Sequence, residues 1–126
     1  MLTSSAKSKG RRLAQAVKDV LLSYLPDSLV ADDIVVTGSG DTGEDLKLSP
    51  RARSFYPYSI ECKNVERLNV WQAYEQAKTH VKDDRIPLLV FSRNRSKIMV
   101  ALELDHFMQL TVDRSAAPLA ASSSKV

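Results

Sequence analysis

The chain has 126 residues, 44% of them hydrophobic and 26% charged, with a formal net charge of +3. This composition is typical of one soluble globular domain, and no apolar run approaches the ~20 residues that a membrane span needs. The first residues are charged and lack the apolar stretch of a secretory signal, and the lone Cys62 excludes an intrachain disulfide. We therefore expect a cytoplasmic protein that makes no membrane contact.

The first predicted element is an amphipathic helix from residue 10 to residue 24. Its apolar residues recur at the spacing of one helix face and are Leu13, Val17, Val20, Leu21 and Tyr24. Pro26 then ends the helix. A short β-branched strand over residues 33–38 runs into the glycine-rich GSGDTG. That segment has the spacing of a dinucleotide-binding turn, but such a turn must open a helix and alternating residues follow instead, so this interpretation fails.

Two stretches of alternating residues come next and are predicted to pair as an antiparallel hairpin. They are residues 44–50 and 56–64, joined by a basic loop over residues 51–55. Side chains alternate between the faces of a strand, so Cys62 points to the apolar side while Glu61 and Lys63 point to the other. If both strands bury their apolar residues, Asp45 emerges on the same face as Glu61. The hairpin therefore predicts two carboxylates and a lysine close together.

The rest of the chain predicts a helix, two strands and a closing helix. These are residues 68–81, 86–93, 97–104 and 105–110, with Asp105 as the cap of the last helix. Trp71 and Tyr74 could stack on bases, but aromatic residues at helical spacing are more often found in the core, and we expect them there. The order α-β-β-β-α-β-β-α indicates an α/β or α+β domain over residues 1–113, with a central mixed sheet flanked by helices. Residues 114–126 are low-complexity and are expected to be disordered.

Asp45, Glu61 and Lys63 form a set of side chains with a defined chemistry. Two carboxylates can hold a hard divalent cation such as Mg2+, together with waters and phosphate oxygens. The cation lowers the pKa of a bound water and stabilises charge in phosphoryl transfer, and a lysine beside it can orient that water. By itself, a Glu and a Lys two residues apart also describes an ordinary surface ion pair.

The segments GEDLKL and ECK together resemble the signature of the PD-(D/E)xK nuclease superfamily, here as D-x15-E-x-K from Asp45 to Lys63. The resemblance covers residues 7–110 and is to small phage and archaeal endonucleases of the Holliday junction resolvase type. It implies a restriction-endonuclease-like core and Mg2+-dependent hydrolysis of DNA, with Mn2+ able to substitute. It also implies a structure-selective activity on branched or double-stranded DNA, and a homodimer.

The same resemblance implies roles for individual residues. Asp45 and Glu61 would be metal ligands, with the Cys62 carbonyl as a third. Lys63 would lie at the attacking water, and Gln76 would approach the site from the second helix.

One position departs from the pattern of the family. Archaeal resolvases of this kind place a Glu four residues after the helix glycine, and Ala14 stands there in this chain. Either the site works with fewer ligands, or Glu44 or Asp41 substitutes, or the site is inactive.

Basic residues gather in two parts of the chain. The first cluster is Lys7, Lys9, Arg11, Arg12 and Lys18, and the second is Arg93, Arg95 and Lys97. Such clusters attract phosphate backbones through counterion release, although most charge runs are solvated faces. With the nuclease resemblance, we expect the nucleic-acid-binding residues to be Lys9, Arg11, Arg12, Arg93 and Arg95.

Other nucleophiles and metal sites are less well supported by the sequence. Cys62 would need a nearby base, and its strand position directs it to the apolar side. His80 and His106 lack the spacing and the cysteine partners of a zinc site. Two hypotheses remain: a metal-dependent DNA endonuclease, and a catalytically inactive or weak nucleic-acid-binding module that retains the nuclease fold.

Overall fold

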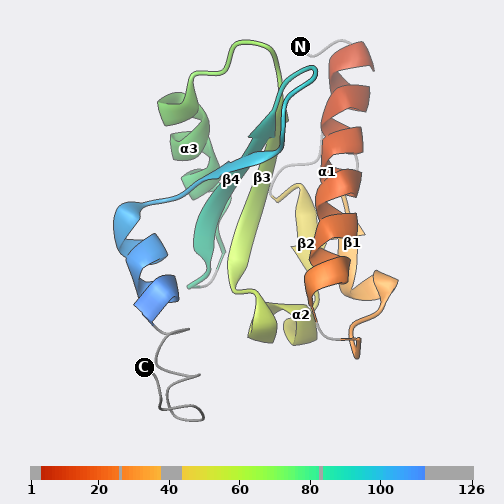
Figure 1. Ribbon diagram of the computed structural model, residues 1–126, viewed down its shortest axis with the longest axis vertical. Coiled ribbons are helices and arrows are strands. Elements are labelled where there is room, and N and C mark those ends of the chain that lie inside the picture. The colour runs from red at the N-terminus through yellow and green to blue at the C-terminus, as the bar shows by residue number, and fades with distance from the viewer. Residues whose placement is uncertain (1–3, 26, 38–43, 83, 113–126) are drawn as a thin grey trace.

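A computed structural model describes residues 4–25, 27–37, 44–82 and 84–112, with side chains from residue 8 onward (Figure 1). The elements are α1 (Ser4–Tyr24), the 3-10 turn η1 (Ala31–Asp33), β1 (Ile34–Val36), β2 (Leu46–Leu48), α2 (Pro50–Phe55), β3 (Tyr58–Asn64), α3 (Val70–Thr79), β4 (Ile86–Ser92), β5 (Met99–Ala101) and a helical segment over 104–112. The fold is α+β with a five-stranded mixed sheet flanked by helices, which confirms the coarse class expected from the sequence. In these described ranges, no helix is long and apolar enough to cross a membrane.

The strands lie in the sheet in their chain order, β1-β2-β3-β4-β5. The pairs β1–β2, β2–β3 and β4–β5 are antiparallel, whereas β3 and β4 are parallel. A parallel pair needs a crossover connection, and α3 supplies it between β3 and β4. Leu46 is opposite Ile60 in the β2–β3 pair, and Lys63 is opposite Phe91 in the β3–β4 pair. These two registers decide which side chains share a face around β3.

The main core lies between α1 and one face of the sheet. Its buried members on α1 are Leu13, Ala14, Val17 and Leu21, and those on the central strands include Leu46, Ile60, Cys62, Leu88 and Val90. Leu89 follows Leu88 in β4 and therefore points to the opposite face, where α3 packs with Ala73 and Ala77 buried. Each face of β3 and β4 is thus covered by a different helix.

The expected loop over residues 51–55 is wrong, because this segment belongs to α2. Ser49 Oγ accepts the Ala52 amide at 3.1 Å as the N-cap, and Pro50 occupies the first helical position, where its fixed φ suits a helix. Ser49 Oγ also donates to Asp33 Oδ1 at 2.7 Å and so ties α2 to η1. The Ser-Pro pair is a helix-start signal that the alternating pattern of the flanking strands obscures.

Four boundaries or positions in the predicted helices and strands also need correction. The helix predicted from residue 10 begins at Ser4, and the strand predicted over 97–104 is limited to β5. Helical residues begin at 104, so Asp105 lies inside the first turn rather than at the cap. Trp71 is 86% exposed, so its expected place in the core is wrong. The close approach of α3 to β4 selects the small residues Ala73 and Ala77 instead.

Candidate active site

Asp45 lies in a bend directly before β2, opposite Glu61 of β3. This placement follows from the antiparallel register. Leu46 is opposite Ile60, so the adjacent residues Asp45 and Glu61 face each other. The Asp45 amide donates to the Ile60 carbonyl at 3.1 Å, and Asp45 Oδ2 accepts the Cys62 amide at 2.6 Å. The Asp45 carboxylate therefore replaces a backbone carbonyl as the acceptor for the Cys62 amide, at the point where the backbone pairing of β2 with β3 ends.

Glu61 is buried, with 6% of its surface exposed. Its Oε1 lies 2.9 Å from His80 Nδ1, and its Oε2 lies 3.7 Å from Lys63 Nζ. A carboxylate accepts hydrogen bonds only, so His80 donates from Nδ1. His80 is the C-cap residue of α3, and the end of this helix thus reaches the carboxylate. The expected alternation along β3 is confirmed, because Cys62 belongs to the core that α1 covers.

The surroundings of Asp45 shift its proton affinity upward. Burial raises the pKa of Asp45 to about 6, and the negative charge of Glu61 adds to this rise. The hydrogen bond from the Cys62 amide and the positive charges of Lys63 and His80 lower the pKa of Asp45 and offset the rise only in part. Two carboxylates in one buried place repel each other, which is a common feature of functional sites.

The thiol of Cys62 is unsuited to nucleophilic attack. Burial raises the pKa of Cys62 well above its ordinary value, and the negative charges of Asp45 and Glu61 raise it further. The thiolate is the nucleophilic form of cysteine, so this residue stays in its unreactive form. The structure therefore agrees with the sequence in giving the Cys62 side chain a packing role.

Glu44 forms a buried ion pair with Arg85. Arg85 Nη1 lies 2.5 Å from Glu44 Oε2, and Nη2 donates to Oε1 at 3.1 Å. The side chains of Arg85 and Glu44 are 8% and 7% exposed. Because one guanidinium engages both carboxylate oxygens, Glu44 is a poor substitute for the acid that the nuclease resemblance implies at position 14.

The structure also shows what stands at the other positions considered for a third acid. Ala14 is 3% exposed and packs in the core between α1 and the sheet. Asp41 lies outside the described residues. Within the described ranges, no group of three or more His, Cys, Asp and Glu side chains is placed to hold a metal ion.

Backbone geometry supplies a third oxygen next to the two carboxylates. In a strand, the amide and carbonyl of one residue point to the same neighbouring strand. The Cys62 amide points to Asp45, so the Cys62 carbonyl leaves β3 on that side as well. Two carboxylates and a carbonyl are oxygen donors of the kind that Mg2+ takes while it keeps several waters. The donors Asp45, Glu61 and Cys62 therefore fit this ion.

The structure brings His80 and Arg85 into the region, and the sequence did not identify either. His80 follows Ala73 and Ala77 at helical spacing, so the stripe of small packed residues on α3 was a usable signal for it. Arg85 contacts a carboxylate 41 positions away, for which no local signal exists. Gln76 is exposed on α3, and within the described part of the chain no hydrogen bond joins its side chain to Glu61 or Lys63.

Members of both predicted basic clusters lie at one end of the sheet. Asn64 ends β3 and is opposite Ser92, the last residue of β4, and its Nδ2 donates to the Lys9 carbonyl on α1 at 3.3 Å. The turn between β4 and β5 therefore lies near the N-terminal half of α1 (Figure 1). The exposed basic residues there are Arg11, Arg12, Arg93, Arg95 and Lys97, with Lys9 half-buried. We call this surface the basic end.

Comparisons of the chain with models of known families, with curated proteins and with solved structures gave no match. The resemblance to PD-(D/E)xK nucleases thus stays a prediction from the sequence motif. The chemistry of Asp45, Glu61 and Lys63 is the basis on which a function can be proposed.

Asp45→Asn should stabilise the protein above pH 6 when no metal is present. The raised pKa of Asp45 means that the folded state holds the proton more tightly than the unfolded chain does. The stability that this proton gives is complete below the ordinary pKa of 3.8 and is lost as the pH rises through about 6. Asparagine has no charge to desolvate, and its side-chain oxygen can still accept the Cys62 amide.

Urea denaturation in EDTA at pH 4 and pH 8 measures this effect. At pH 8 we expect the free energy of unfolding of the variant to exceed that of the wild type by on the order of 1–3 kcal/mol, and at pH 4 we expect little difference. Asp32→Asn, at an exposed carboxylate in η1, is the control and should change stability by less than about 0.5 kcal/mol. A variant no more stable than the wild type at pH 8 would contradict the prediction.

Proposed function

We propose that this chain is a metal-dependent endonuclease that hydrolyses phosphodiester bonds in DNA. One observation carries the proposal: Asp45 and Glu61 face each other across adjacent strands, and Lys63 lies against Glu61. Their oxygen donors suit Mg2+, with Mn2+ as a substitute. The resemblance to PD-(D/E)xK nucleases supports the same chemistry through the same three residues.

Each group has a defined task in this reaction. Asp45, Glu61 and the Cys62 carbonyl would hold the ion, which supplies a bound water of lowered pKa and positive charge beside the phosphate. His80 restrains Glu61 through the 2.9 Å hydrogen bond, so the carboxylate keeps one orientation. The Lys63 side chain is 31% exposed, and its ammonium can orient the attacking water or neutralise charge that develops on the phosphate.

The basic end supports DNA as the substrate. Its residues gather where β3 finishes, one position beyond Lys63. Lysine and arginine side chains that contact phosphates release condensed counterions, which gives affinity without sequence preference. We propose that Lys9, Arg11, Arg12, Arg93 and Arg95 hold the backbone of the DNA strand whose phosphate reaches Glu61.

A structure-selective activity of the Holliday junction resolvase type follows from the family resemblance. A four-way junction presents two symmetric strands, and a two-fold dimer with one site per protomer is the simplest way to cut both. The edge strand β5 and the segment after it expose large apolar side chains, which supports a protein interface: Met99, Val100, Leu104 and Phe107 are each at least half exposed. We therefore propose that the chain acts as a homodimer on branched DNA.

A second candidate function is a nucleic-acid-binding module without catalysis. The observation that favours it is the burial of Ala14 in the core, which leaves the candidate site with two carboxylates, Asp45 before β2 and Glu61 in β3. Both candidates predict binding to DNA at the basic end. Only the first predicts cleavage that depends on Mg2+.

The wild-type protein should nick DNA in Mg2+ and should not nick it in EDTA. Asp45→Asn and Glu61→Gln should each reduce the nicking rate roughly 100-fold or more, because each removes a negative charge that holds the ion. Affinity for DNA in EDTA should change little. Glu75→Gln is the matched control, because Glu75 is an exposed carboxylate on α3 that pairs with Lys78 outside the site.

Linear, nicked, branched and four-way substrates compared side by side would show the preferred DNA structure. A nicking rate equal to that of the wild type in either carboxylate variant would show that the site is elsewhere. DNA binding without any nicking by the wild type would favour the non-catalytic module.

Replacing Arg93 and Arg95 together with Ala should weaken binding to DNA of any sequence. The slope of log K against log salt concentration should become shallower by about 0.9 for each phosphate that the variant no longer neutralises. Fluorescence anisotropy in EDTA over a series of KCl concentrations gives this slope. Arg51→Ala is the control, since Arg51 is exposed on α2 at the end of the sheet away from the β4–β5 turn (Figure 1). An unchanged slope in the double variant would exclude phosphate binding by the turn.

Light scattering at micromolar concentration should give twice the 14.0 kDa mass of the chain. Val100→Glu should shift the mass toward that of the monomer, because it places a charge on the exposed edge strand. Val35→Glu, at a similarly exposed position on the opposite edge strand, is the control. A monomer both free and bound to a junction would argue against the resolvase form of the proposal.

A further inference from the structure

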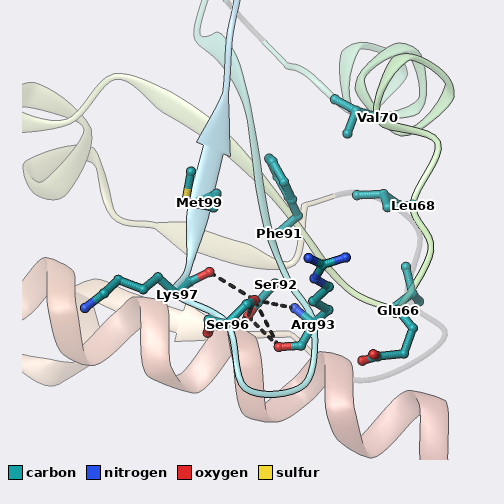
Figure 2. A pocket seen from close by; sticks show the side chains of 10 residues that line it. Glu66, Leu68, Val70, Phe91, Ser92, Arg93, Ser96, Lys97 and Met99 are labelled. Atoms are coloured by element: carbon teal, nitrogen blue, oxygen red, sulfur yellow. Dashed lines mark hydrogen bonds between the residues drawn. The ribbon is translucent and has the colours of Figure 1, made fainter.

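A pocket of about 290 Å³ opens between the β4–β5 turn and residues 65–70 (Figure 2). Its apolar lining includes Leu68, Val70, Phe91 and Met99, and its basic residues are Arg93 and Lys97. Figure 2 shows the side chains of Phe91 and Arg93 pointing into the space between the turn and the facing segment. The volume is just below the range of ~300–1,000 Å³ for small-molecule sites, so the pocket suits one flat group of nucleobase size.

The pocket adjoins the candidate active site on the same face of the sheet. Phe91 is directly opposite Lys63 in the parallel β3–β4 pair, and Leu89 is opposite Glu61. Paired residues on adjacent strands project to the same face, so Phe91 stands beside the lysine on the side away from Asp45. A DNA strand with a phosphate at Lys63 therefore has a neighbouring nucleotide within reach of the pocket.

Hydrogen bonds hold the walls of the pocket in place. Glu66 Oε2 accepts the Asn94 amide at 2.7 Å, which ties the segment after β3 to the tip of the β4–β5 turn. Ser96 Oγ accepts the Arg93 amide at 3.1 Å and closes the turn itself. The two positive charges of Arg93 and Lys97 outnumber the one negative charge of Glu66, so the rim of the pocket is net basic. The site is thus formed before any ligand arrives.

We propose that this pocket binds one unpaired nucleobase of the DNA substrate next to the phosphate that is cut. The base stacks on the Phe91 ring among the apolar side chains, and Arg93 and Lys97 contact the flanking phosphates. Stacking on an aromatic ring is tolerant of base identity, so the pocket reads the absence of pairing rather than the sequence. The inference rests on DNA being the substrate, and it gives a physical source for selectivity toward branched DNA, whose junctions offer unstacked nucleotides.

Two duplexes that differ by a single extra, unpaired nucleotide at the centre of one strand test the proposal. Binding is measured by anisotropy in EDTA, so that no cleavage occurs. The wild type should bind the bulged duplex roughly 10-fold more tightly than the paired one, and Phe91→Leu should abolish most of this preference, since stacking one base on an aromatic ring accounts for an effect of about this size. Leucine keeps an apolar side chain at this half-buried position and removes only the flat ring.

Trp71→Leu is the matched control, because Trp71 is an exposed aromatic outside the pocket, and it should keep the preference. The fluorescence of 2-aminopurine as the unpaired base gives a second measurement on the wild type alone, and it should change on binding as the base leaves the helical stack. Equal affinity of the wild type for both duplexes, or full preference in a folded Phe91→Leu, would overturn the proposal.

The nicking assay keeps the two proposals separate. Cleavage of paired DNA without a preference for the bulge would support the proposed nuclease activity and contradict the proposed binding of a base in the pocket. A preference for the bulge that depends on Phe91, without cleavage by the wild type, would support the pocket and leave the protein as a binding module.

Discussion

The hydrogen bond from the Cys62 amide to the Asp45 carboxylate decides the geometry of the candidate site. It is 2.6 Å long and stands where the backbone pairing of β2 with β3 ends. An amide left unpaired there would cost about 1–3 kcal/mol, so the carboxylate is held against β3 rather than free in solvent. Held there, it faces Glu61, and burial raises the pKa of Asp45 to about 6. The fold therefore keeps two carboxylates together against their repulsion, which is what a cation site requires.

Of the three carboxylates in this region, Asp45 is the one whose negative charge is least compensated by positive neighbours. Glu61 is contacted by His80 and Lys63, and Glu44 is paired with Arg85, whereas the contact of Asp45 is a neutral amide. A bound cation would supply the missing positive charge. Packing also limits the number of ligands, because position 14 lies in the α1 core, where a carboxylate would lose its hydration without a partner. The site is thus built from the sheet, with His80 as the contribution of a helix.

The face of the sheet on which each strand side chain lies could be predicted from the sequence. Side chains alternate between the two faces, so identifying the apolar face also fixes which residues lie on the other. Leu46 and Ile60 turn toward α1, and this alone places Asp45 and Glu61 together on the other side. The helix α2 was missed because its Ser-Pro start lies between two alternating stretches. Contacts such as those of His80 with a carboxylate 19 positions away depend on the crossover of α3, which local spacing does not encode. The carboxylates could therefore be identified from local periodicity, whereas the side chains that contact them are determined by tertiary packing and could not.

The β3–β4 pair places the candidate site and the proposed base pocket on one surface. It is paired over seven residues on each strand, whereas the register of β2 with β3 is marked by a single pair. Glu61 and Lys63 project from one face of β3, so the proposed metal ligand and the lysine lie side by side, whereas Asn64 projects to the opposite face and connects β3 to α1 at the basic end. Alternate residues on a strand are roughly 6–7 Å apart, and Phe91 lies across from the lysine. A base in the pocket and a phosphate at Glu61 would therefore be positioned by the same rigid ladder. Any shift in the register of β3 and β4 would disturb the proposed recognition and the proposed cleavage together.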